Sequence, residues 1–260
     1  MLKQQVGIEF KKVFTFNRVL TWFLIITLPI WIQYLIIHEG YSFTSNIDLY
    51  GRLLNGIGAM IFPILILFVF ADTIIHEKKD NFLTYTKIRI DFSIYLNAKI
   101  ITNAILSFVV SFLYAFLPFL FAQYINPQVG FISNIMVDTN PHGTTTFEQL
   151  LVYGPFLYGF IYSLWIGVNG VLYATLPLLL CLILDNSFVG LSIPFVWYQG
   201  MSFVTAMLGI SQFAPLYTIF PYSILQQEIW TVFVPFLILL IMVIISYVYL
   251  RKRDSKEWSF

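Results

Sequence analysis

Charged residues are scarce in this sequence. Of its 260 residues, 10% are Asp, Glu, Lys or Arg, while 59% are hydrophobic and 19% aromatic. A soluble globular domain carries roughly 25% charged residues, so this chain has too little polar surface to cover a water-soluble globule. Its formal net charge is +1, and no basic face for nucleic acid can be assembled outside short loops. The composition predicts a membrane protein that has no nucleic-acid partner.

Cysteine and the common catalytic motifs are also nearly or wholly missing. The one cysteine, Cys181, excludes an internal disulfide and a multi-cysteine metal site. The three histidines fall in separate loops, and His76-Glu77 lacks the second His that a zinc-protease helix needs one turn later. Neither a G-x-x-x-x-G-K-[ST] loop nor a G-x-S-x-G elbow occurs. We therefore expect no enzyme, and no cofactor or metal held by this chain.

Long apolar stretches dominate what is present. A helix needs about 20 apolar residues to cross the hydrocarbon core, and helix is the economical structure there because it satisfies its own backbone hydrogen bonds. Six stretches qualify, at approximately 19–37, 53–75, 100–124, 153–184, 187–210 and 229–250. The sequence thus predicts an all-α, multi-pass membrane protein with one transmembrane domain over residues 1–260.

The positions of the cations predict the orientation of these spans. With six spans, residues 1–18, residues 76–99 and the tail after Leu250 share one side of the membrane. All but one of the 14 Lys and Arg residues lie there, Arg52 being the exception. Positive charge is retained on the cytoplasmic side, so both termini are predicted to be cytoplasmic. The cations on that side are Lys3, Lys11, Lys12, Arg18, Lys78, Lys79, Lys87, Arg89, Lys99, Arg251, Lys252, Arg253 and Lys256.

The fourth stretch is long enough to be one tilted helix or a tight pair of helices. A pair would add a seventh span and place the basic tail outside, so we expect a single helix that turns at Asp185-Asn186. Small residues form a stripe along it at helical spacing, which permits close approach of another helix. That stripe could serve packing within the bundle, or a dimer or moving interface. Its members are Gly159, Ser163, Gly167 and Gly170.

The hydrophilic segment between the second and third spans alternates charged with aromatic or apolar residues. Asp80 could cap a short helix containing Phe82, Leu83 and Tyr85, and Lys87-Ile88-Arg89-Ile90 makes a basic turn after it. The composition fits an amphipathic loop lying on anionic lipid. The alternative is a docking element for a cytoplasmic partner.

This segment resembles the loop between the second and third spans of type-2 ATP-binding-cassette (ABC) transporter permeases. In that family an acidic-basic stretch leads into a short coupling helix and a basic turn, and an aromatic and a lysine follow as the third helix starts. The plan of the whole chain is similar too, with a basic amphipathic N-terminal segment, an external broken segment before the sixth span and a basic tail. The matching residues are Glu77, Asp80, Phe82, Leu83, Lys87, Arg89, Tyr95 and Lys99.

The resemblance implies a permease that pairs with a second copy or a paralogue. A separate ATPase subunit, which would bind ATP and Mg²⁺, would dock on the coupling segment. Family members mostly export amphiphiles, and this composition resembles small Gram-positive peptide-export and immunity permeases of the plasma membrane. A membrane sensor or scaffold without transport is the competing class. The expected coupling residues are Glu77, Asp80, Phe82, Leu83, Tyr85, Lys87 and Arg89.

Overall fold

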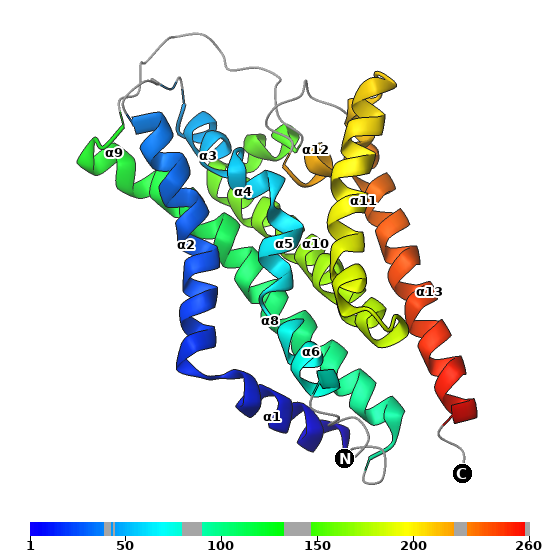
Figure 1. Cartoon of the computed structure of the whole chain (residues 1–260). Coiled ribbons are helices and arrows are strands. Elements are labelled where there is room, and N and C mark those ends of the chain that lie inside the picture. The colour runs from blue at the N-terminus through cyan, green and yellow to red at the C-terminus, as the bar shows by residue number, and fades with distance from the viewer. Residues whose placement is uncertain (39–42, 44, 80–89, 133–146, 221–227, 258–260) are drawn as a thin grey trace.

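The computed structural model of the protein describes residues 1–38, 43, 45–79, 90–132, 147–220 and 228–257 (Figure 1). Its regular structure over these ranges is helical, without a strand. The long helices are α2 (Phe16–His38), α8 (Phe92–Leu120), α10 (Pro155–Ile183), α11 (Ser187–Met207) and α13 (Phe233–Glu257). The short α-helices are α1 (Leu2–Val13), α3 (Asn46–Leu54), α4 (Ile57–Met60), α5 (Phe62–Leu67), α6 (Asp72–Lys79), α9 (Asn126–Val129) and α12 (Pro215–Ile219). A π-helical turn over Phe121–Ile125 joins α8 to α9.

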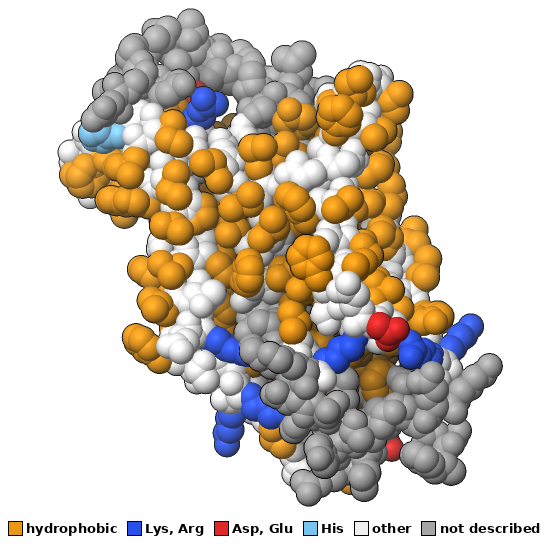
Figure 2. Space-filling view, viewed as in Figure 1, with side chains coloured by type: hydrophobic (Ala, Val, Ile, Leu, Met, Phe, Trp, Pro, Cys, Tyr) orange, Lys and Arg blue, Asp and Glu red, His pale blue; other side chains and the backbone are white. Residues whose placement is uncertain are grey.

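Four helical segments in the described ranges are long and apolar enough to cross a membrane: Phe16–His38, Phe92–Val129, Pro155–Ile183 and Ile229–Arg253. The third of these, which contains α10, is the most enclosed by the rest of the protein. Apolar side chains form a broad belt across the face of the bundle seen in Figure 2, and many large apolar side chains are exposed. The all-helical class predicted from the sequence is therefore confirmed, and the four apolar helices are consistent with the predicted membrane protein.

The helices run between two ends of the bundle that differ in charge. α1 and the last turns of α13 lie at one end, while α3 and α12 lie at the other (Figure 1). Lys and Arg side chains gather around the end that holds α1, and Arg52 on α3 lies at the opposite end (Figure 2). We call the end with α1, α6 and the last turns of α13 the basic end.

The expected second span, 53–75, is divided into several helices, so the prediction of one continuous helix there was wrong. α3 ends at Leu54, and α4, α5 and α6 follow as separate pieces. Gly56 precedes α4 in an extended conformation and packs so closely on α2 that a Cβ there would lie 2.1 Å from Gln33 Oε1. Pro63, in the first turn of α5, has no backbone N–H to continue a helix from α4. Close packing and a missing donor therefore divide the stretch.

Side chains from other helices satisfy backbone carbonyls at these breaks. Tyr198 Oη on α11 donates to Ala59 O at 2.8 Å, and Gln199 Nε2 donates to Met60 O at 2.6 Å. Trp22 Nε1 on α2 donates to Val69 O, between α5 and α6, at 3.1 Å. Broken helices are tolerated in lipid when neighbouring side chains take up the freed backbone groups. The interrupted stretch is thus compatible with a position inside the membrane.

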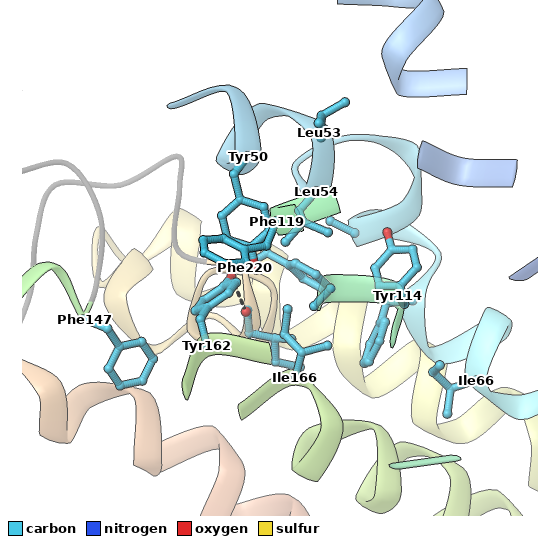
Figure 3. Packing of buried hydrophobic residues seen from close by; sticks show 14 of the residues in the cluster. Tyr50, Leu53, Leu54, Ile66, Tyr114, Phe119, Phe147, Tyr162, Ile166 and Phe220 are labelled. Carbon is cyan, nitrogen blue, oxygen red and sulfur yellow. Dashed lines mark hydrogen bonds between the residues drawn. The ribbon is translucent and has the colours of Figure 1, made fainter. Parts of the chain in front are cut away.

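An aromatic core fills the end of the bundle that holds α3 and α12. The ring of Tyr50 packs there against two others (Figure 3). Its centroid lies 5.5 Å from that of Phe119 and 6.0 Å from that of Tyr162. Tyr162 Oη also donates to Ile219 O in α12 at 2.8 Å, and Phe220 after it is fully buried. The described part of the broken segment before the expected sixth span therefore packs against the bundle through α12.

Candidate functional site

The predicted stripe of small residues on α10 packs against α8. A Cβ added to Gly159 would lie 2.3 Å from the Phe119 ring, and one on Gly170 would lie 1.9 Å from Ser111 Oγ. Gly167 lies under the ring of Phe108 in the same way. Ser163 is fully buried, and its Oγ donates to Gly159 O at 2.7 Å. These residues bring the two helices together within one chain.

Substitutions on this stripe should therefore be costly. We expect Gly159→Ala to destabilise the protein by about 1–3 kcal/mol, because the added methyl group overlaps the Phe119 ring. Gly200→Ala in α11 is the matched control, since no atom lies within 4 Å of its added Cβ. Thermal unfolding in detergent measures both. Equal melting temperatures for the two variants would show that the α8–α10 contact is not tight.

The α8 side of this contact carries fully buried polar residues. They are Thr102, Asn103, Ser107 and Ser111. One of them bonds across the contact, since Asn103 Nδ2 donates to Thr175 Oγ1 on α10 at 3.1 Å. An intramembrane amide or hydroxyl commonly bonds across helices in this way. At the basic end of the row, the next buried polar side chain on α8 is a charged one.

That side chain is Lys99, which is fully buried between two carboxylates. Its Nζ lies 2.6 Å from Glu9 Oε2 on α1 and 2.7 Å from Glu77 Oε1 on α6. Glu9 is 1% exposed. A charge removed from water is costly unless it is paired and hydrogen-bonded, so these contacts fix the positions of α1, α6 and α8 relative to one another.

Further groups complete the pairing. Tyr95 Oη donates to Glu77 Oε2 at 2.6 Å, and Lys12 Nζ lies 3.6 Å from Glu9 and 3.5 Å from Glu77. The group thus combines two carboxylates with two ammonium groups, and its charges balance. Lys99 Nζ also lies 5.6 Å from the centre of the Tyr95 ring, within cation–π range. We call Glu9, Lys12, Glu77, Tyr95 and Lys99 the Lys99 cluster.

The neighbouring residue of α6 reaches a different helix. Lys78 Nζ donates to Leu184 O at 2.7 Å, to Asp185 O at 3.0 Å and to Cys181 O at 3.3 Å. A cation at a helix C-terminus satisfies the last carbonyls and interacts well with the helix dipole. Two consecutive residues, Glu77 and Lys78, therefore connect α6 with α1 and α8 on one side and with the end of α10 on the other.

The structure brings together only part of the expected coupling segment. Glu77 lies in the Lys99 cluster with the two residues that the family pattern places at the start of the third span, Tyr95 and Lys99. The cluster thus connects Glu77, at the beginning of the segment, with Tyr95 and Lys99, at its end. The remaining expected residues lie outside the described ranges: Asp80, Phe82, Leu83, Tyr85, Lys87 and Arg89.

Sequence reasoning missed the role of Glu9. A signal was available, because Glu9 is the only acidic residue among the first 38. It also lies four residues from Gln5 and from Val13, which gives all three one face of a helix. That face is the buried one in α1, where Gln5 Nε2 donates to Glu9 Oε1 at 3.2 Å.

Comparisons with protein families, with curated proteins and with solved structures found no match to this chain. What the basic end does is therefore inferred from its contacts. It is a charge-balanced junction of α1, α6 and α8, linked through Lys78 to α10 and placed at both ends of one hydrophilic segment.

Proposed function

We propose that the protein is the membrane-spanning permease subunit of an ABC transporter. It exports an amphiphilic substrate, such as an antimicrobial peptide, a drug or an envelope component, with ATP hydrolysed by a separate subunit. The proposal includes a second permease copy or paralogue, a bacterial plasma membrane, six spans and cytoplasmic termini. Amphiphile export and the bacterial setting rest on the family resemblance.

One observation carries the proposal: the Lys99 cluster lies at the base of the expected coupling segment. A permease that hydrolyses no ATP itself must receive movement from its partner through a cytoplasmic contact. Glu77 on one side of the segment is bonded to Tyr95 and Lys99 on the other, so displacement of the segment would be passed to α8 and α1. Lys78 extends the path to α10. An unanchored lipid-lying loop would need none of these buried contacts.

The charge map and the fold both favour six spans. α2, α8, α10 and α13 lie in the four segments suited to cross a membrane. α11, with 21 residues, runs beside α10 through the bundle, and the divided stretch α3–α6 has carbonyls at its breaks bonded to Trp22, Tyr198 and Gln199. A chain passing six times through the membrane has both its ends on one side, and the distribution of the cations supports a cytoplasmic position for that side.

Purification with a candidate partner tests the proposal. The gene should be co-expressed with any ATPase gene that lies beside it, and native mass spectrometry of the complex in mild detergent should show at least two permease copies with bound ATPase. A transport-inactive chain that purifies alone would favour the sensor or scaffold class. A transport-active monomer without an ATPase would also overturn the assignment.

A further inference from the structure

An apolar groove runs along the outer side of the bundle between α2 and α8. Its volume is about 610 Å³, and it reaches inward to the buried side chain of Leu53 on α3. Trp31 and Phe23 on α2, both 60% exposed, stand at its outer edge. Thr27 on α2, Leu117 on α8 and Phe121 in the π-helical turn also line it.

The lining offers almost nothing to a polar ligand. The hydroxyl group of Thr27 already donates to Phe23 O at 2.8 Å. The other polar side-chain groups of the lining are the Trp31 indole N–H and the Tyr34 hydroxyl, toward one end of the groove, and the remaining residues are apolar. An extended peptide in the groove would leave its backbone N–H and C=O groups without partners, which is costly in an apolar site. The occupant must therefore be a chain without hydrogen-bonding groups, or a helix that satisfies its own.

The exposure of the α2 wall favours a hydrocarbon chain. Phe23, Leu28 and Trp31 are each more than half exposed, and α2 is one of the segments long and apolar enough to cross a membrane. The exposed apolar side chains of a spanning helix face the acyl chains of the bilayer. A single hydrocarbon chain is also narrow enough to reach inward past α2 to Leu53.

The length and polarity of the groove point to one leaflet of a bilayer. Its α2 wall extends from Phe23 to Tyr34, about 16 Å along a helix, which is close to half of the ~30 Å hydrocarbon core. At one end, Trp31 and Tyr34 stack with centroids 5.6 Å apart, and Tyr34 and His38 lie 5.2 Å apart. Trp and Tyr favour the headgroup level of a membrane. The headgroup would thus lie at the end with α3.

We propose that this groove binds one acyl chain of a membrane phospholipid from the leaflet at the α3 end. The chain would extend from the Trp31–Tyr34 pair toward Phe23 and cover Leu53 and Leu117. This binding depends on membrane insertion alone, so it holds whether or not an ATPase drives the protein.

Photo-crosslinking in lipid nanodiscs tests the site. The nanodiscs would contain phosphatidylcholine with a diazirine in one acyl chain, and adducts would be mapped by peptide mass spectrometry. Groove residues Thr27, Leu117 and Phe121 should be labelled at least fivefold more than Phe203 and Ile245, which are exposed apolar residues on α11 and α13. This wild-type ratio decides the question even where a variant fails to fold.

A pair of variants on α8 provides the matched control. Leu117→Trp should fill the groove and lower labelling of Thr27 and Phe121 at least threefold, while Ile105→Trp should leave it unchanged. Leu117 and Ile105 are similarly exposed, at 42% and 46%. Equal labelling of the groove and the control surfaces would overturn the proposal, since it would indicate ordinary surrounding lipid. An unlabelled groove, with disulfides forming between copies carrying Leu28→Cys in a Cys181→Ala background, would overturn it in favour of a second copy.

Discussion

Lys99→Met is expected to destabilise the protein by about 3–5 kcal/mol, because removing one partner of a buried ion pair leaves a buried charge uncompensated. Lys99 lies within 2.7 Å of both Glu9 and Glu77, so its loss affects two carboxylates at once. The remaining cation, Lys12, lies 3.5 Å or more from each and is 40% exposed. It cannot replace the lost contacts. Unfolding in detergent, followed by circular dichroism, measures the change.

Two matched variants show whether the effect belongs to the buried pair. Lys12→Met removes the same charge from a partly exposed position of the same cluster, where an ion pair contributes at most about 1 kcal/mol. Adding Glu9→Gln to Lys99→Met should recover part of the lost stability, because it removes one of the two carboxylate charges that Lys99→Met leaves without their buried partner. Equal losses from Lys12→Met and Lys99→Met would show that the buried ammonium group stabilises the junction no more than the exposed one.

The broad class could be predicted from the sequence because lipid imposes simple rules. A chain with 10% charged residues and long uncharged stretches has few alternatives to helices in a membrane. The break in the second stretch could not be predicted in the same way. Gly and Pro are common in membrane helices. The stretch around Gly56 and Pro63 can be broken here because Tyr198 and Gln199 supply donors to the carbonyls left free at the break. Those donors lie 139 residues further along the chain.

The candidate site was predictable to a similar extent. The resemblance selected Glu77, Tyr95 and Lys99 one by one along the chain, and the structure shows that they touch one another. Glu9 could not be placed beside them, because its burial depends on where α1 docks on α8. The stripe on α10 is a parallel case, since its spacing indicates close packing while only the fold identifies α8 as the partner.

The second large effect concerns the proposed contact with an ATPase subunit. Changing Phe82 and Leu83 together to Ala is expected to weaken ATPase binding by roughly 10- to 100-fold, because interface energy concentrates in a few buried apolar anchors. Transport should fall with it, while hydrolysis by the remaining complex becomes insensitive to substrate. Neither residue belongs to the Lys99 cluster, so the melting temperature of the isolated permease should stay the same. Titration of ATPase onto nanodisc-held permease measures the affinity, and a vesicle assay measures transport.

A second variant distinguishes docking from lipid contact. Lys87→Gln with Arg89→Gln removes the basic turn and retains both apolar anchors. If the segment docks on an ATPase, this variant should lose little affinity, since rim charges chiefly affect association rates and their salt dependence. If the segment only lies on anionic lipid, the order reverses: the Phe82 and Leu83 changes leave ATPase binding intact, and the charge changes weaken contact with anionic vesicles. Unchanged ATPase binding and transport in the Phe82→Ala, Leu83→Ala chain would therefore count against a permease driven through this segment.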